Sequence, residues 1–166
     1  MTSAAFVPDT GRRDVAVINK EGLTPSEATF FAVGSGRAVT SLHGVSCTSV
    51  LCREVEDQEL VHAQLPIGTA EIIFWPSLVG KPPSDIPDPG QVNYLPMAQR
   101  LAQHMGAHVV QCNWPNALYN PEASYLGESA VISQSGEVLF RLPRDEAGVA
   151  TFVLGESEYT WSPTVT

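Results

Sequence analysis

The run Glu71–Trp75 (EIIFW) constrains the fold of this chain more than any other segment. Its side chains are almost all apolar, which is typical of a strand that is covered on both faces. An amphipathic segment follows at Leu95–Met105, where Pro96 suits the first turn of a helix and Gly106 its end. A further predicted strand, His108–Asn113, comes next. A strand, a helix and a strand in this order predict an α/β fold with helices packed on a mixed sheet.

Further segments extend this pattern in both directions. Arg37–His43 and Val45–Leu51 are rich in Val, Thr and Ser, so we expect them to pair as a hairpin. Apolar residues recur among charged ones across Arg53–Leu65, which predicts an amphipathic helix. The other expected strands are Asp14–Asn19, Glu128–Ser133, Glu137–Leu142 and Val149–Leu154, and irregular loops are expected at 76–90 and 114–126. Residues 1–154 are expected to form a single domain, followed by a polar tail, 155–166, that frays or reaches a partner.

Composition limits the partners of the chain. Its 166 residues, 43% of them hydrophobic, can bury a core without disulfide bonds or a structural metal. The net charge of −9 argues against nucleic acid and anionic membranes as partners, and no run approaches the ~18 apolar residues of a membrane span. The N-terminus does not look like a signal peptide. Cys47, Cys52 and Cys112 lack metal-site spacing, so we expect reduced thiols, a cytoplasmic location, and neither a metal nor another cofactor.

Chemistry-bearing residues follow several of the predicted strands. Lys20 comes after the first strand, and Cys52 ends the expected hairpin. The turn Trp75–Ser77 and Asn113 lie at the ends of the predicted strands Glu71–Trp75 and His108–Asn113. Because ligands gather at the carboxyl ends of strands in such sheets, we expect these residues to converge on one edge.

Cys52 is the strongest candidate for a reactive group. It lies where a predicted strand ends and a predicted helix begins, and unpaired N–H groups at such a position favour the thiolate. The alternative is a buried structural cysteine. Lys20 could stabilise negative charge on an attacked substrate, and its alternative is a solvated surface lysine.

Five segments in sequence resemble the carbon–nitrogen hydrolase (nitrilase) superfamily. They are Asn19–Glu27 with its lysine, proline and glutamate, Val50–Glu54 around the cysteine, Gly68–Ser77 with its Pro-Ser ending, His108–Asn113, and Gly127–Val138. The resemblance runs from about Val15 to Leu154.

This resemblance implies a partial αββα sandwich, with four layers formed on dimerisation, and a small amide, nitrile or N-carbamoyl substrate. It implies that Cys52 is the nucleophile, that Lys20 stabilises the tetrahedral intermediate and that Glu27 orients the lysine. The Arg53 N–H would help to bind the oxyanion. The pocket would include Trp75, Ser77 and Asn113, and the protein would form a homo-oligomer.

The sequence also departs from the family pattern. Residues 1–19 contain no glutamate, whereas the general base of the family lies upstream of the lysine. Arg53 replaces the usual aromatic residue after the cysteine. The chain therefore corresponds to the C-terminal two-thirds of the family fold. Three functions remain open: a carbon–nitrogen hydrolase, a non-catalytic oligomerisation module, and a redox-responsive thiol protein that uses Cys52 with Cys47 or Cys112.

Overall fold

A computed structural model describes most of the chain. The described residues are 4–8, 15–34, 36–42, 44–77, 94–113, 116–117, 120–124, 129–143 and 146–164. Most of the loop expected at 76–90, and parts of the loop expected at 114–126, lie outside these ranges.

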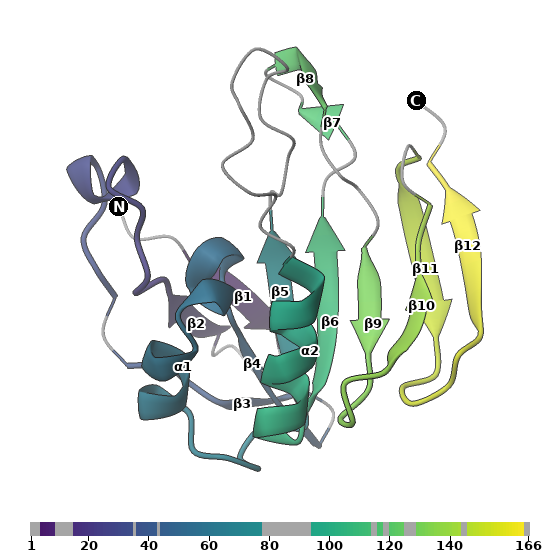
Figure 1. Cartoon of the computed structure of the whole chain (residues 1–166), viewed down its shortest axis with the longest axis horizontal. Coiled ribbons are helices and arrows are strands. Elements are labelled where there is room, and N and C mark those ends of the chain that lie inside the picture. Colours follow the sequence, from purple (N-terminus) through teal and green to yellow (C-terminus); the bar gives the residue numbers. More distant parts are fainter. Residues whose placement is uncertain are drawn as a thin grey trace.

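A six-stranded mixed sheet forms the centre of the described structure (Figure 1). In spatial order its strands are β10 (Val138–Arg141), β9 (Ala130–Ile132), β6 (His108–Asn113), β5 (Ile72–Ser77), β4 (Val45–Ser49) and β3 (Thr40–Leu42). Strands β4, β5 and β6 are parallel, and the other neighbours are antiparallel. The predicted α/β class and the hairpin β3–β4 are confirmed.

Two α-helices lie beside each other, with α2 (Tyr94–Met105) over β5 and β6 and α1 (Gln58–Gln64) next to it (Figure 1). The prediction of one helix over Arg53–Leu65 is wrong at its start. Cys52–Glu56 instead form a 3-10 turn, η2, and α1 begins after Asp57. The Asp57 side chain accepts a hydrogen bond from the Leu60 N–H at 3.0 Å. This N-cap starts a new helix and so divides the segment.

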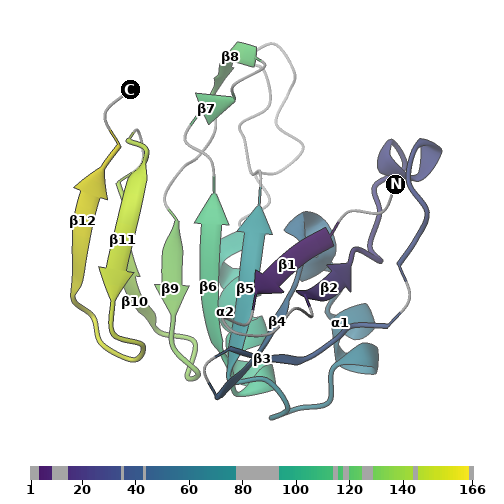
Figure 2. The ribbon, with the colours of Figure 1, turned by 180° about the vertical axis from the view of Figure 1, so that it is seen from behind.

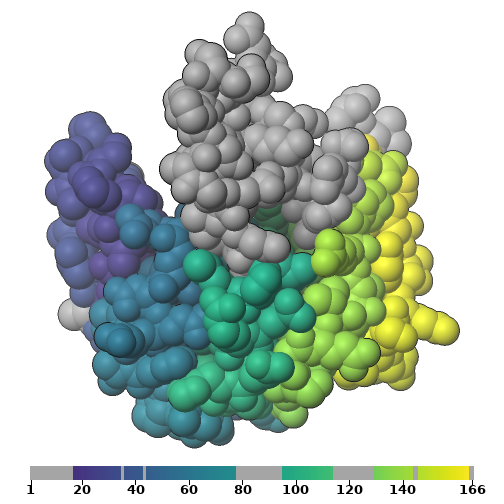
Figure 3. Space-filling view, in the orientation of Figure 1, coloured from purple at the N-terminus to yellow at the C-terminus, as the bar shows by residue number. Residues whose placement is uncertain are grey.

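The helix-covered face of the sheet holds the main hydrophobic core. Ile73 and Trp75 of β5 are completely buried there, as is Val109 of β6. They pack with residues of η2, α1 and α2 and with the residue that follows α1, namely Val55, Val61, Leu65, Ala98, Leu101, Ala102 and Met105. In the space-filling view the residues of α1 and α2 form a continuous surface over this face (Figure 3).

The second face of the sheet is covered in part by an N-terminal hairpin. Strands β1 (Ala4–Pro8) and β2 (Val15–Asn19) pair antiparallel and lie on this side, in front of β4 and β5 when seen from behind (Figure 2). Ile18 and Cys47 are completely buried here, and the half-buried Ile72 and Phe74 pack against them. Strand β2 was predicted, but β1 was not.

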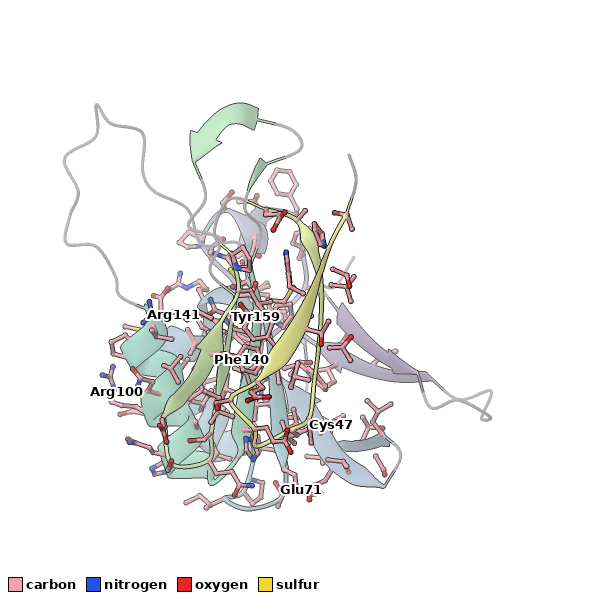
Figure 4. All side chains as sticks on the ribbon, turned by 90° about the vertical axis from the view of Figure 1, so that its right-hand side faces the viewer. Cys47, Glu71, Arg100, Phe140, Arg141 and Tyr159 are labelled. Atoms are coloured by element: carbon pink, nitrogen blue, oxygen red, sulfur yellow. The ribbon has the colours of Figure 1, made fainter. Side chains whose placement is uncertain are left out.

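A second hairpin lies at the opposite end of the sheet. Strands β11 (Gly148–Phe152) and β12 (Tyr159–Pro163) pair antiparallel, so the prediction that the segment after Gly155 frays is wrong for β12. The Phe140 ring of β10 stacks on the Tyr159 ring, with 4.7 Å between the ring centroids (Figure 4). The Phe152 ring meets the Phe140 ring edge-on, with 5.1 Å between the centroids. These aromatic contacts dock the hairpin on the sheet.

A short strand pair lies where an irregular loop was predicted. Strands β7 (Asn116–Ala117) and β8 (Asn120–Ser124) pair antiparallel. Because β-pairing needs only backbone groups, it can form without the alternating apolar pattern that marks a half-buried strand in a sequence.

Candidate active site

Cys52 lies in a strained turn beyond the end of β4. Its φ of 53° is the one positive value at a non-glycine position among the described residues, and such a conformation costs about 1–3 kcal/mol. The Cys52 side chain is half-buried, and its carbonyl oxygen accepts a hydrogen bond from the buried Trp75 indole at 2.7 Å. A sheet residue of the core thus holds the backbone of the cysteine in place.

Lys20 is buried, which rules out the alternative of a solvated surface lysine. Its side chain is 3% exposed, and its Nζ lies 2.6 and 2.7 Å from the two carboxylate oxygens of Glu27, the first residue of the 3-10 turn η1 (Glu27–Thr29). Glu27 also accepts a hydrogen bond from the Thr24 N–H at 2.8 Å, and its own N–H donates to the Thr24 hydroxyl at 3.0 Å.

The partners of Glu27 control its ionisation. Burial opposes the charged form, but the hydrogen bonds and positive charge of Lys20 and the hydrogen bonds of Thr24 outweigh it. They lower the pKa of the Glu27 carboxyl below its ordinary value of 4.5. The carboxylate is therefore a stable anionic partner that fixes the Lys20 amine.

Glu54 connects the lysine-bearing loop to the cysteine-bearing turn. It is completely buried, and one carboxylate oxygen accepts from the N–H groups of Glu21 at 2.7 Å and Gly22 at 3.0 Å. The other oxygen accepts from the Leu51 N–H at 2.6 Å. Since Glu21 follows Lys20 and Leu51 precedes Cys52, the residues next to both candidates bind one carboxylate.

Arg37 completes this network from the segment before β3. Its side chain is buried. One guanidinium nitrogen, Nη1, donates to the Ser49 carbonyl and to the Glu54 carboxylate, 3.3 Å away. The Nη2 atom also lies 3.3 Å from the Glu54 carboxylate. The sequence reasoning missed both Arg37 and the buried position of Glu54. The available signal was an arginine beside a β-rich run, with a glutamate two residues after the cysteine.

The remaining predicted site residues lie elsewhere around this edge. The Arg53 side chain is 40% exposed and lies 3.7 Å from the Glu56 carboxylate. Ser77 and Asn113 are buried register partners at the ends of β5 and β6. The Ser77 hydroxyl donates to the Cys112 carbonyl at 3.4 Å, and the Asn113 N–H donates to the hydroxyl of Ser129, the residue before β9, at 2.9 Å. These contacts join β5, β6 and the start of β9.

The other cysteines differ from Cys52 in position. All three are free thiols; Cys47 is buried and Cys112 is exposed. Burial raises the pKa of the Cys47 thiol. Within the described ranges there is no group of three or more His, Cys, Asp or Glu side chains that could hold a metal ion. In the same part of the chain, no helix is long and apolar enough to cross a membrane.

Solved structures resemble this arrangement, although no family model and no curated protein matches the sequence. An amidase from Nesterenkonia sp. AN1, as a glutamate-to-glutamine mutant carrying the acetamide moiety of fluoroacetamide on its active-site cysteine, aligns with a TM-score of 0.63 and 22% identity. The match covers 78% of this chain and 46% of that one. The fold is a partial nitrilase-type fold.

Two further structures of the same amidase extend this comparison. A cysteine-to-alanine mutant, described as belonging to the nitrilase superfamily, has a TM-score of 0.62, 21% identity, and coverage of 78% and 46% of the two chains. A cysteine-to-alanine mutant in complex with butyramide has a TM-score of 0.62, 20% identity, and coverage of 80% and 48%. This chain therefore spans less than half the length of the amidase that it resembles.

Proposed function

We propose that this protein is a carbon–nitrogen hydrolase that acts on a non-peptide C–N bond of a small amide, nitrile or N-carbamoyl compound. The observation that carries the proposal is the junction at Glu54, which joins a strained cysteine turn to a loop whose buried Lys20 is paired with Glu27. The fold that it shares with an amidase is the second support.

In the proposed reaction Cys52 attacks the carbonyl carbon of an amide. A carbon–sulfur bond forms, and an electron pair moves onto the carbonyl oxygen. The Lys20 ammonium and the Arg53 backbone N–H stabilise this oxyanion. Glu27 holds the ammonium in place. The tetrahedral intermediate then breaks its C–N bond, and ammonia leaves with the proton that the thiol gave up.

The second half of the proposed reaction releases the product. Water adds to the thioester, the carbon–sulfur bond breaks, and the carboxylic acid leaves as the Cys52 thiol regains a proton. Residues 1–19 supply no glutamate for the base of this step. Because general acid–base catalysis typically contributes about 10²–10⁴-fold, this hydrolysis should be slower than the acylation step.

The first test is covalent labelling with fluoroacetamide. Sulfur attacks the fluorine-bearing carbon, a carbon–sulfur bond forms, and fluoride leaves. We expect intact-mass spectrometry to find a single adduct and peptide mapping to place it on Cys52. Cys112→Ser, which removes the exposed thiol, is the matched control and should label normally, whereas Cys52→Ala should not label. Labelling of wild type that is no faster than that of an unfolded thiol would contradict the proposal.

The second test is turnover of acetamide and butyramide. We expect ammonia release that is lost in Cys52→Ala and strongly reduced in Lys20→Met. Ammonia release that stops after one equivalent per protein, with a thioester that remains on Cys52, would restrict the activity to the acylation half-reaction.

A second candidate function is a non-catalytic oligomerisation module. It is favoured by the large apolar side chains exposed at the β11–β12 end, where Val149 is 60% exposed and Val153 is 61% exposed. Analytical ultracentrifugation tests it: a stable oligomer that Val149→Lys dissociates, together with an unreactive Cys52, would favour this function over the hydrolase.

A further inference from the structure

We propose that Glu54 is a positioning residue that sets the distance between the lysine loop and the cysteine turn. This inference rests on the proposed function, because it concerns how the two reacting segments are held. Glu54 itself follows Cys52 by two residues, and its carboxylate points away from solvent into the gap between the segments.

The hydrogen bonds of the Glu54 carboxylate connect two separate segments of the chain. A carboxylate is an acceptor only, and each of its oxygens here accepts from backbone N–H groups of a different segment. One oxygen binds the loop at Glu21 and Gly22, which lie 33 and 32 positions earlier in the chain. The other binds the turn at Leu51, three positions earlier. A change in this side chain therefore moves one segment relative to the other.

The residues around the Glu54 side chain leave it little room to move. A Cβ atom added at Gly22 would lie 2.9 Å from the Glu54 Cγ, so the loop approaches the carboxylate as closely as glycine allows. The Lys20 carbonyl on the same loop accepts a hydrogen bond from the Gly34 N–H at 2.9 Å, which fixes the loop at its far end. The position of Lys20 is thus determined by Glu54 on one side and by Gly34 on the other.

Arg37 supplies the positive charge that this buried carboxylate requires. The guanidinium lies 3.3 Å from the Glu54 oxygen that also binds Leu51, and it donates to the carbonyl of Ser49 at the end of β4. Through Arg37, the Glu54 carboxylate is therefore connected to the sheet as well as to the two segments. Such a charge-assisted contact is stronger and more directional than one between neutral groups.

The test compares Glu54→Gln with Glu59→Gln in a Cys112→Ser background. Both substitutions remove one carboxylate, but Glu59 is exposed on the first turn of α1. Two reagents are used: fluoroacetamide, which carries an amide, and methyl methanethiosulfonate, which does not. Displacement of reacting groups by about 1 Å can cost about 10²-fold in rate.

We expect Glu54→Gln to slow the fluoroacetamide reaction of Cys52 between about 10-fold and 100-fold, with little change in the methanethiosulfonate reaction. Glu59→Gln should change neither rate. Hydrogen exchange should show faster exchange of the Glu21 and Gly22 amides in Glu54→Gln alone. An unchanged ratio of the two rates, or equal loss with both reagents, would overturn the positioning role.

If Glu54→Gln fails to fold, Arg37→Lys tests the same inference. Arg37→Lys keeps a positive charge but loses the guanidinium nitrogen that contacts both the Ser49 carbonyl and the Glu54 carboxylate, and it should show the same selective loss of amide reactivity. Failure of the proposed function gives a different result, since wild type itself would then be unreactive with fluoroacetamide. The exchange measurement still decides the inference in that case, because unchanged protection of Glu21 and Gly22 in Glu54→Gln would refute it.

Discussion

The two faces of the central sheet are built differently. The helix-covered face buries Ile73, Trp75 and Val109 completely against α1, α2 and η2. On the second face Ile72 and Phe74 are only half-buried, and Cys112 is exposed. The difference teaches that the covered side holds most of the core, and Trp75 from that core also holds the Cys52 carbonyl.

The second face also contains a groove. It has a volume of about 440 Å³ and lies between β6, β9 and β10 and the β11–β12 hairpin. Its lining is mainly apolar and includes Val110, Val131, Phe140 and Ala150. Added atoms should therefore be accepted in this groove and resisted at the Glu54 junction.

The largest expected difference comes from two neighbouring isoleucines on β5. Ile73→Ala removes a completely buried side chain and should lower the free energy of unfolding by about 2–5 kcal/mol. Ile72→Ala, one residue away on the half-buried face, should cost clearly less. Urea denaturation of both variants measures the difference. Equal losses would mean that the two faces are equally packed.

The next comparison adds atoms to each region. Gly22→Ala brings a methyl group within 2.9 Å of the Glu54 Cγ and should cost about 1–3 kcal/mol, because the junction cannot expand. Ala150→Val adds more volume but projects into the groove, so its effect should be small. Thermal unfolding of the two variants tests this, and a costly Ala150→Val would show that the groove is not open space.

A smaller effect is expected at the hairpin. Phe152→Ala removes the edge-on contact with Phe140 and should cost about 0.5–1.5 kcal/mol beyond the area lost. Because the contact lies at the end of the sheet, amide exchange should rise in β11 and β12 and stay unchanged in β5. Increased exchange in both places would indicate that the hairpin is part of the main cooperative unit.

The smallest expected effect is a pH dependence between α1 and α2. The His62 and His104 rings stack at 3.8 Å, and burial together with the His104 charge lowers the pKa of His62 below 6.5. The unfolded chain then binds more protons, so stability is complete above pH 6.5 and falls as the pH is lowered past that value. His62→Gln should flatten this part of a denaturation series between pH 7.5 and 5.5. An unchanged slope would assign the effect to other groups.

Much of the fold could be predicted from the sequence because its signals are local. The apolar run of β5, the proline in the first turn of α2 and the glycine after its end, and the valines of β6 each mark their own element. The division after η2 could not be predicted with the same ease. Asp57 satisfies a helical pattern and an N-cap equally well, and only the structure shows that its side chain binds Leu60.

The parts that were missed depend on contacts between distant residues. Strand β12 is polar in sequence, and it is held by Tyr159 against Phe140 and by the Trp161 indole, which donates to the Glu146 carboxylate at 2.6 Å. At the site, Lys20 and Cys52 were predicted from their positions after strands, and Glu27 was added by the resemblance; the catalytic roles of all three stay predictions. Arg37 and Glu54 are 17 positions apart, and no local pattern announces that they meet.

The left-handed backbone at Cys52 has a consequence for how its thiol can be reached. The Trp75 indole on its carbonyl and the Glu54 carboxylate on the preceding Leu51 N–H oppose its return to an ordinary conformation. Both restraints come from fully buried side chains, so the turn cannot relax by a small surface fluctuation. Bulky thiol reagents, which need this turn to relax, should then react with the Cys52 sulfur only as fast as the interior opens. The rate of that reaction would therefore measure how often the interior opens.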